Sequence, residues 1–228
     1  MPDLFYQILF LILAYLIGSI PTGFLIGKSK GVDVREHGSN NIGATNTARV
    51  LGKKYFILVI LLDGLKGFIF VFLFRFNILP FEWCLLSPIL YGISAVLGHV
   101  FPIFLKFKGG KAVATGAGVA LGYSPIICLV GIIAFIIVHL ATKYVSLGSI
   151  IGASSILLFS LIASISTNQI FDNLYSIPSA KVWPLNLWFV IGVFIIVLII
   201  FIKHKANINR LVHNEENKFE LINERKEK

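Results

Sequence analysis

The sequence predicts an all-α integral membrane protein with about seven transmembrane helices, an N-terminus outside and a C-terminus in the cytoplasm. Of its 228 residues, 57% are hydrophobic and the mean hydropathy is +0.86, which is too apolar for an ordinary soluble domain. Lipid cannot satisfy backbone polar groups, so a spanning segment must be a helix or part of a closed barrel. The apolar runs are continuous rather than alternating, and this excludes the barrel.

Seven apolar stretches approach the roughly 20 residues that a spanning helix needs. Almost nothing is left for a soluble domain, so residues 1–213 are expected to form one membrane domain, followed by a charged tail, 214–228, that frays. The first stretch has no preceding Lys or Arg, unlike a secretory signal peptide, and should remain as a helix. One short, glycine-rich stretch, Ala112–Tyr123, is either a half-span or continuous with its neighbour. The predicted spans are Leu4–Ile26, Tyr55–Phe76, Trp83–Phe104, Ala112–Tyr123, Ile126–Ala141, Gly148–Ser164 and Leu185–Ile202.

The cations are distributed unequally between the two sides of these spans. Cytoplasmic loops carry an excess of Lys and Arg. Placing the N-terminus outside puts the basic loops and the basic tail inside, and leaves only Arg75 and Lys181 on the opposite side. The net charge of +9 is dispersed among these loops, which favours anionic lipid headgroups and phosphorylated substrates as partners rather than nucleic acid. Cys84 and Cys128 lie in apolar stretches without metal-ligand spacing, so no metal, disulfide or cofactor is expected.

The loop from Lys106 to Lys111 reads Lys-Phe-Lys-Gly-Gly-Lys and stands between two apolar stretches. Glycines allow backbone N–H groups to approach an anion, and the free N–H groups at a helix start carry partial positive charge. Lys111 adds a full charge next to Gly109 and Gly110. The pattern therefore predicts a phosphate-binding loop at the membrane surface.

A second polar segment, residues 31–49, follows the first span. It combines hydrogen-bonding side chains with Gly38 and Gly43, which permit tight turns. One interpretation is a well-capped helical hairpin. The other is a shelf that holds an oxyanion, with Arg49 as a bidentate partner; it is not a Walker loop, because the chain contains no GxxxxGK[ST]. The candidate residues here are Ser39, Asn41, Thr45, Asn46 and Arg49.

Two ionisable residues, Asp63 and Lys66, lie within the second span on one helical face. Such groups usually face the interior of a bundle. They either help to build a polar site or form an i,i+3 ion pair that joins helices, and the ion pair is slightly favoured. His99, beside the helix-breaking Pro102, is expected to support the phosphate loop. Ser149, after the short turn that begins at Lys143, is assigned a similar supporting role.

The tail after the last span places His204, Asn207 and Arg210 at i, i+3 and i+6, close to one face of a helix. A basic anchor that snorkels to the membrane surface would explain the cations. It would not explain Asn207, which has no electrostatic reason to lie on an anchoring face.

Taken in order, these segments resemble the bacterial acyl-phosphate:glycerol-3-phosphate acyltransferase family. The resemblance runs from Gly18 to about Glu216 and is carried by three motifs. The first is Gly-Ser-Asn-Asn-Ile-Gly-Ala-Thr-Asn, residues 38–46, with Arg49. The second is Gly-His-Val-Phe-Pro, 98–102, continuing through the lysine loop to Thr115. The third is His-Lys-Ala-Asn-Ile-Asn-Arg-Leu, 204–211.

Two positions depart from the family pattern. Asn40 stands where the family usually has glycine, and Asn214 replaces a glycine in the tail. Asparagine tolerates positive φ better than other non-glycine residues, so both replacements are expected to keep the backbone path.

The resemblance implies a fold and a reaction. A fatty acyl group would pass from acyl phosphate to the 1-hydroxyl of glycerol 3-phosphate, giving lysophosphatidate and inorganic phosphate, the first step of phospholipid synthesis. It implies a multi-pass protein of the bacterial inner or plasma membrane, with the active site on its cytoplasmic face. Ser39, Arg49 and Lys111, with the Gly109 and Gly110 amides, would bind phosphate groups, while His204 and Asn207 would hold glycerol 3-phosphate or orient its hydroxyl. The general base is either His204 or a substrate phosphate oxygen.

Other functions fit less well. A secondary transporter for a phosphorylated metabolite also uses broken helices that point at an anion, but its site lies near the membrane midplane. The polar segments here gather on one side, and only Asp63 and Lys66 approach the midplane. A membrane scaffold would leave the Asn, Ser and Lys clusters unexplained, and a CDP-alcohol phosphotransferase would need clustered aspartates for its metal, which the sequence lacks.

Overall fold

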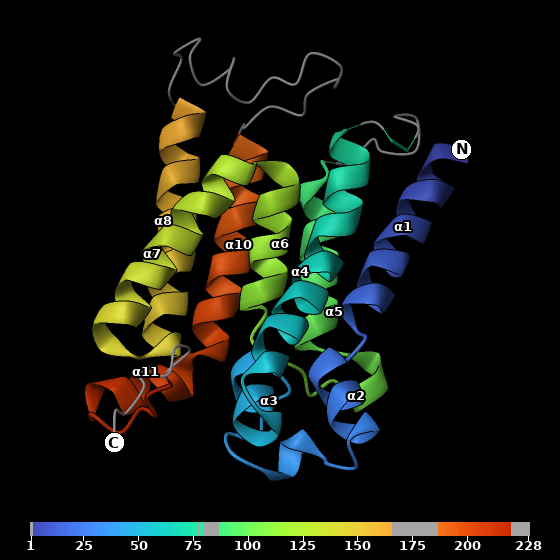
Figure 1. Ribbon diagram of the computed structural model, residues 1–228. Coiled ribbons are helices and arrows are strands. Elements are labelled where there is room, and N and C mark those ends of the chain that lie inside the picture. The colour runs from blue at the N-terminus through green and yellow to red at the C-terminus, as the bar shows by residue number, and fades with distance from the viewer. Residues whose placement is uncertain (1, 77, 80–86, 166–186, 220–228) are drawn as a thin grey trace.

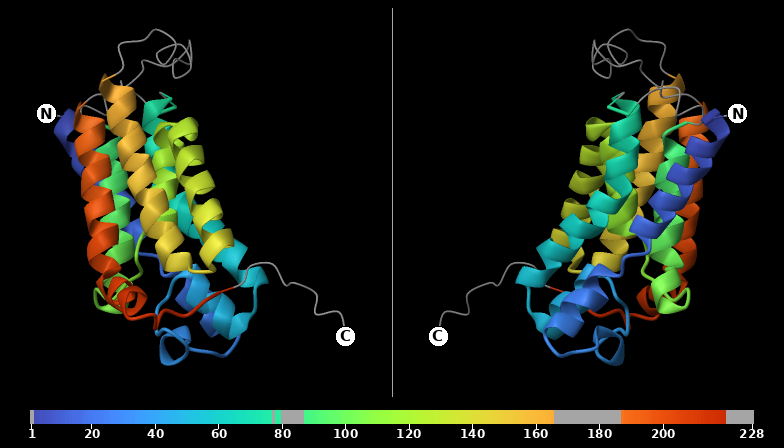
Figure 2. Two further views of the ribbon diagram at one scale, coloured as in Figure 1. Left: turned by 90° about the vertical axis from the view of Figure 1, so that its left-hand side faces the viewer. Right: turned by 90° about the vertical axis from the view of Figure 1, so that its right-hand side faces the viewer.

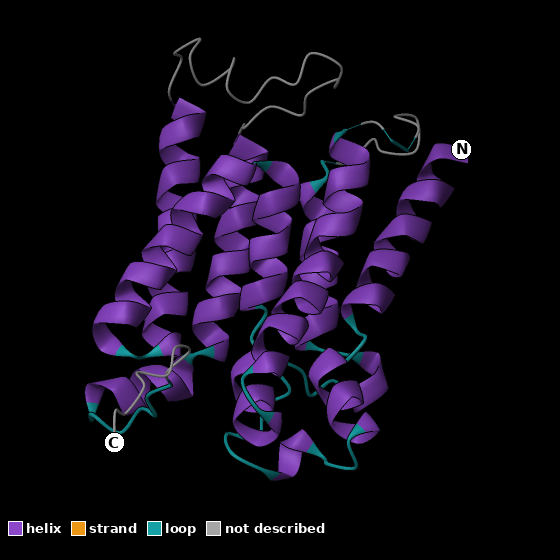
Figure 3. Ribbon diagram, in the orientation of Figure 1, coloured by secondary structure: helices purple, strands orange, loops and turns teal. Residues whose placement is uncertain are grey.

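The computed structural model describes residues 2–76, 78–79, 87–165 and 187–219, and all regular secondary structure in these residues is helical (Figure 3). Seven helices run side by side along the molecule (Figure 1). They are α1 (Pro2–Gly18), α4 (Lys54–Arg75), α5 (Ile89–Val100), α6 (Val113–Tyr123), α7 (Pro125–Thr142), α8 (Val145–Ile165) and α10 (Leu187–Lys203). The prediction of an all-α protein is confirmed for the described residues.

Each of the seven apolar stretches contains helix within its described residues, but these helices differ in length. By length and composition, α4, α7 and α8 could each cross a membrane, and the number rises to five if each bent helix pair counts as one span. The segments Ile89–Leu105 and Val113–Tyr123 are shorter apolar helices. Seven crossings, and the orientation of the termini, therefore stay predictions.

The first predicted span, Leu4–Ile26, is wrong as a single helix. It consists of α1 and α2 (Thr22–Ser29), which meet at an angle of 42°. Pro21 causes the break, because it has no N–H to donate to the carbonyl four residues earlier. The third stretch is also shorter than predicted: the described helix ends at Val100 before Pro102, while residues 83–86, including Cys84, lie outside the described part of the chain.

Close contact between α4 and α6 fixes the start of α6. A Cβ atom on Gly67 would collide with the Thr115 carbonyl, and one on Gly118 would collide with the Gly64 carbonyl. Small residues let helix backbones approach in this way within an apolar bundle. The helix α6 ends separately from α7, because Ser124 accepts a hydrogen bond from the Ile127 amide as the N-cap of α7. Within the stretch Ala112–Tyr123, residues Val113–Tyr123 thus form a short helix of their own.

One end of the bundle, the lower end in Figure 1, carries three short helices and most of the described lysines and arginines. We call it the basic end. The helices are α2, α3 (Ala44–Leu51) and α11 (Lys205–Val212), and both views in Figure 2 place them below the long helices. Because α11 turns by 58° from the axis of α10, the third motif lies across the end of the bundle.

The residues after α11 also fold against the basic end, which differs from the predicted fraying from residue 214. The Phe219 amide donates to the Lys143 carbonyl at 2.9 Å, and the Phe219 ring lies 5.5 Å from that of Phe56. Residues 213–219 are therefore part of the packed structure. The predicted tail beyond them, 220–228, lies outside the described residues.

Candidate active site

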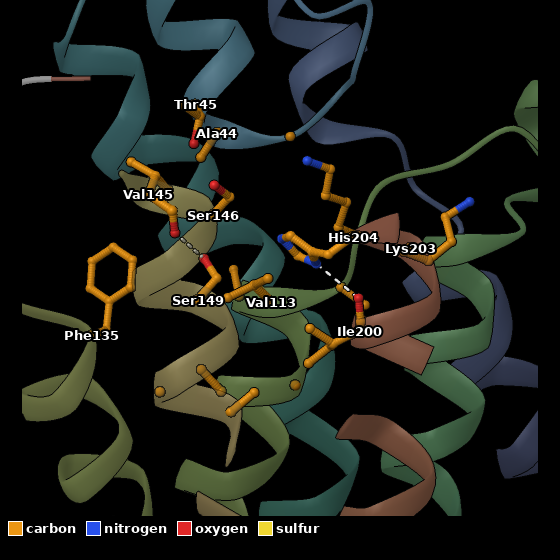
Figure 4. A pocket seen from close by; sticks show the side chains of 18 of the residues that line it. Ala44, Thr45, Val113, Phe135, Val145, Ser146, Ser149, Ile200, Lys203 and His204 are labelled. Carbon is orange, nitrogen blue, oxygen red and sulfur yellow. Dashed lines mark hydrogen bonds between the residues drawn. The ribbon is translucent and has the colours of Figure 1, made fainter. Parts of the chain in front are cut away.

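A cavity of ≈ 760 Å³ opens at the basic end and extends between α4, α6, α7, α8 and α10. Its outer part is polar, and its inner part is lined by side chains such as Ile132, Ile156 and Ile196. Figure 4 shows Thr45, Ser146 and Ser149 on one side of this space and His204 on another. A single space therefore joins a polar mouth to an apolar interior.

Most of the predicted site residues meet at this cavity, although they come from distant parts of the sequence. Asn46, Gly109 and Gly110 do not line it. Those that line it are Ser39, Asn41, Thr45, Arg49, His99, Lys111, Ser149, His204, Asn207 and Arg210. Among the described residues, no group of three His, Cys, Asp or Glu side chains could hold a metal ion.

A chain of hydrogen bonds connects the second and third motifs. The Lys111 ammonium donates to Asn207 Oδ1 at 2.6 Å, and Asn207 Nδ2 donates to Glu216 Oε1 at 2.6 Å. The other Glu216 oxygen accepts from Arg210 Nε at 2.7 Å. Burial lowers the pKa of Lys111 to about 8. The nearby Glu216 charge acts against this shift, and the Arg210 and Arg49 charges add to it.

Glu216 lines the cavity mouth, although it was not among the candidate residues expected from the sequence. The sequence places it in the charged tail, 214–228. Its separation of nine residues from Asn207 would not put the two side chains on one face of a helix, so the pattern did not connect them. Burial alone would raise its pKa, yet hydrogen bonds from Asn207 and Arg210 and the Arg210 charge bring the pKa below its usual value. The carboxylate is therefore ionised at neutral pH, and it orients both donors at the cavity mouth.

His204 is only 2% exposed and stands at the junction of α10 and α11. Its Nδ1 lies 2.8 Å from the Ile200 carbonyl (Figure 4). A carbonyl only accepts, so the hydrogen bond assigns the proton to Nδ1 and leaves the Nε2 lone pair available. Burial and the nearby Lys111 charge lower the pKa of His204 to about 4. The ring is thus neutral at physiological pH and able to accept a proton.

Asn46 organises the first motif from within. Its Oδ1 accepts from the Ser39 amide at 2.7 Å, and its Nδ2 donates to three carbonyls, those of Val34, His37 and Asn41, at 2.8–3.1 Å. The side chain has no polar atom left for a ligand, so the expectation that it binds substrate is replaced by a structural role. The loop that it holds presents Ser39 at the cavity mouth.

Arg49 projects from α3 toward the folded tail. Its Nη2 donates to the Asn217 carbonyl at 3.2 Å, and its guanidinium lies 5.8 Å from the centre of the Phe219 ring. The residues of α2, the loop and α3 form a helical hairpin, but neither helix has a side-chain N-cap, so this is not the well-capped hairpin that the sequence left open. The same hairpin brings Ser39 and Arg49 to the cavity.

The glycines of the second motif serve close packing in this structure. The Gly110 amide donates to the His99 carbonyl at 3.0 Å, and a Cβ on Gly110 would overlap the His99 ring. The Gly110 amide is therefore not free for a phosphate, in contrast to the predicted cradle. The loop turns sharply around this contact, with φ of 51°, 62° and 60° at Lys106, Phe107 and Ala112.

The ion pair favoured for Asp63 and Lys66 is present, with Lys66 Nζ 2.5 Å from Asp63 Oδ1. It is not isolated. Thr22 donates its hydroxyl to the same carboxylate oxygen, and the His99 ring lies 3.7 Å from it. Asp63 and His99 also line the cavity, so the pair borders the candidate site as well as joining helices.

The chain is similar to proteins of one family along nearly its whole length. A family model described as glycerol-3-phosphate acyltransferase matches residues 8–214. A glycerol-3-phosphate acyltransferase of Acholeplasma laidlawii is 41% identical over 223 residues, covering 93% of this chain and 94% of that protein. One from Bacillus subtilis (strain 168) is 41% identical over 216 residues, covering 94% and 98%.

Two solved structures are similar in both sequence and fold. A crystal structure of PlsY (YgiH), an integral membrane glycerol 3-phosphate acyltransferase, in its glycerol 3-phosphate form, matches with a TM-score of 0.78 and 38% identity. The match covers 94% of this chain and 96% of that one. The lysophosphatidic acid form matches with a TM-score of 0.75 and 37% identity over the same shares.

Proposed function

Because this chain belongs to the glycerol-3-phosphate acyltransferase family, and is an integral membrane acyltransferase, we propose that acyl phosphate is its acyl donor. The acyl group passes to the 1-hydroxyl of glycerol 3-phosphate, and the products are lysophosphatidate and inorganic phosphate. The observation that carries this proposal is the cavity itself, in which cationic and hydroxyl side chains at the mouth adjoin an apolar groove between helices. An acyl phosphate has the same two parts.

The residues at the mouth suit a reaction between two phosphorylated molecules. Two such anions repel each other, and the main task of the site is to hold them together and stabilise the developing oxyanion. Lys111, Arg49 and Arg210 supply positive charge there, and Ser39 supplies a hydroxyl. We assign Ser39, Arg49 and Lys111 to the phosphate groups of the substrates.

His204 and Asn207 are assigned to glycerol 3-phosphate. The 1-hydroxyl oxygen attacks the acyl carbonyl carbon, a new C–O ester bond forms, and the bond from that carbon to the phosphate oxygen breaks. The hydroxyl proton passes to His204 Nε2, for which the neutral Nδ1-protonated ring is suited, or to a phosphate oxygen of the substrate. Direct attack is favoured because the sequence has no GxSxG or other recognisable covalent-nucleophile motif.

The proposed location follows from charge and chemistry. With the N-terminus outside, the basic end faces the cytoplasm of a bacterial cell, and the cavity opens at the inner surface of the plasma membrane. Water-soluble glycerol 3-phosphate then enters from the cytoplasm, while the acyl chain lies in the groove between helices.

The first experiment is release of inorganic phosphate from acyl phosphate by the purified protein in detergent, with and without glycerol 3-phosphate. We expect release that depends on glycerol 3-phosphate and yields lysophosphatidate. Lys111→Ala should reduce it by about 100-fold, the loss typical of removing a group that stabilises transition-state charge. Lys108→Ala is the matched control, since Lys108 is an exposed lysine of the same loop that does not line the cavity. Absence of release by folded protein would contradict the proposal and favour the transporter alternative.

The role of His204 is tested separately with His204→Gln. An amide keeps a hydrogen-bonding side chain at this position but cannot accept a proton at neutral pH. We expect kcat to fall by about 100-fold if His204 is the general base. Near-normal turnover across pH would assign the base to a substrate phosphate oxygen.

A further inference from the structure

A cluster of buried polar side chains lies beside the cavity, and no step of the proposed reaction uses it. It consists of Thr22 on α2, Asp63 and Lys66 on α4, and His99 at the end of α5, which are 9%, 3%, 5% and 6% exposed. Lys66 Nζ lies 2.5 Å from Asp63 Oδ1, 2.5 Å from the Ile20 carbonyl oxygen and 3.3 Å from Thr22 Oγ1. The cluster thus connects three separate helices at the basic end.

Stability alone is a weak reason to keep a buried ion pair. Its desolvation offsets much of the attraction between the two charges, and replacing such a pair with apolar residues is often neutral or stabilising. Ionisable groups inside a membrane helix bundle are costly and usually serve a polar site. The contacts that the pair makes beyond itself are therefore the place to look for its role.

Those contacts lead to the phosphate loop through His99. On one side of the His99 ring, Nδ1 lies 3.7 Å from Asp63 Oδ1. On the other side of the ring lies Gly110, so close that a Cβ there would overlap Nε2. The His99 carbonyl also accepts from the Gly110 amide at 3.0 Å, and a Cβ on Gly109 would collide with that carbonyl.

The loop held in this way ends at Lys111, which the proposed function assigns to phosphate binding. Lys111 directly follows Gly110, and its ammonium lies 2.6 Å from Asn207 Oδ1 on α11. The loop backbone has positive φ at three non-glycine residues, Lys106, Phe107 and Ala112. Such a conformation costs free energy and persists only where the surroundings impose it.

We propose that Asp63 and Lys66 are positioning residues of the active site: their ion pair fixes the His99 imidazole, and His99 fixes the loop that aims Lys111 at the substrate phosphate. The inference rests on the proposed function for its phosphate. It assigns to the ion pair a role in the site in addition to joining helices. None of the three residues needs to touch the substrate.

The test removes the ion pair as a unit, with Asp63→Asn and Lys66→Gln in one protein, so that no unpaired charge is left buried. Hydrogen–deuterium exchange of residues 106–112 is measured in the full-length protein in detergent, together with KM and kcat. We expect exchange at Gly110 and Lys111 to become about tenfold faster. kcat/KM for glycerol 3-phosphate should fall about tenfold, with a higher KM, because Lys111 is present but poorly placed both to bind phosphate and to stabilise transition-state charge.

Ser94→Ala is the matched control. It removes the hydrogen bond from Ser94 Oγ to the Leu11 carbonyl, 2.7 Å long, which joins α5 to α1 away from the loop. Exchange at the loop and KM should stay as in the unmodified protein. If the double variant does not fold, Thr22→Val is used instead, since it removes the hydrogen bonds of Thr22 with Asp63 and Lys66 and keeps every charge; loop exchange should then rise about threefold.

Unchanged loop exchange and unchanged KM in a folded double variant, or in Thr22→Val, would overturn the inference. The exchange measurement does not depend on the reaction. If the unmodified protein released no phosphate, the proposed function would fail while faster loop exchange in the variant would still support the structural link.

Discussion

Lys111 is buried enough at the cavity mouth for its charge to depend on pH in the range where enzymes are assayed. Its pKa is lowered to about 8, so the ammonium is charged below pH 8 and becomes neutral above it. We expect kcat/KM for glycerol 3-phosphate to fall as pH rises through about 8, because kcat/KM reports the groups of the free enzyme. Lys111→Arg should move this fall to much higher pH, since arginine stays protonated. A fall at pH 8 that persists in Lys111→Arg would assign it to another group.

His204 should limit kcat/KM at acidic pH, where its ring takes up a proton. Because its pKa is lowered to about 4, the neutral ring that accepts a proton persists down to about pH 5. The acidic limb of the same profile should therefore lie well below the value of about 6.5 for an ordinary histidine.

Asn40 occupies a backbone conformation that few side chains accept. Its φ is 55°, and the second family departure, Asn214, has φ of 60°, so both asparagines adopt the positive φ that glycine accepts without strain. Asn40→Ala should lower the free energy of unfolding by about 1 kcal/mol, whereas Asn40→Gly should be nearly neutral. Thermal unfolding in detergent measures both. Asn209→Ala, in an ordinary helical conformation of α11, is the control, and an equal loss there would contradict the argument.

The segment 213–219 behaves as an element of the fold although it has no regular secondary structure. It places Glu216 against Asn207 and Arg210, and its Phe219 packs on Phe56. Truncation after Val212 should abolish most activity, because it leaves both donors unoriented and uncovers the cavity mouth. Truncation after Phe219 should retain it. Glycerol-3-phosphate-dependent phosphate release compares the two proteins, and similar activities would argue against a role for this segment.

At the scale of the whole molecule, the groove between helices is the space that we propose for the acyl chain. Its floor on α6 runs from Val113 to Ala120, about 10 Å along the helix axis. Ala117→Leu should partly fill the groove and shift the preferred donor to shorter chains, with kcat/KM for the longest chain falling about tenfold. Ala134→Leu, on α7 outside the groove, is the control. Competition between acyl phosphates of different length provides the measurement, and an unchanged preference would place the chain elsewhere.

Much of this architecture follows from local sequence. The apolar stretches had to form helices, since lipid or a bundle interior offers no other partner for their backbone groups. The motifs and the resemblance to the family made Ser39, Arg49, Lys111, His204 and Asn207 candidates, and all five line one cavity. The break at Pro21 could have been predicted from the missing N–H, but the apolar composition on both sides hid it.

Other features depended on contacts between segments far apart in the chain. Asn46 was a candidate substrate ligand because its side chain can form hydrogen bonds. Only the folded loop shows that its Oδ1 and Nδ2 are already hydrogen-bonded within the protein. Glu216 resembled part of a charged tail until the chain turned back onto Asn207. The glycines at 109 and 110 suggested free amides, and only the position of His99 shows that one of them is occupied.

The sequence by itself determined the helical class of the protein, the basic character of one end and the chemical nature of its motifs, because hydropathy, charge and turn chemistry act over a few residues. The tertiary structure alone decided which polar groups remain available to a substrate. A hydrogen bond depends on the distance and direction between two atoms, and these atoms can belong to residues far apart in the chain. Lys111 and Asn207, which form such a bond, are 96 residues apart. No local pattern encodes that geometry; it arises when α6, α10 and α11 pack together.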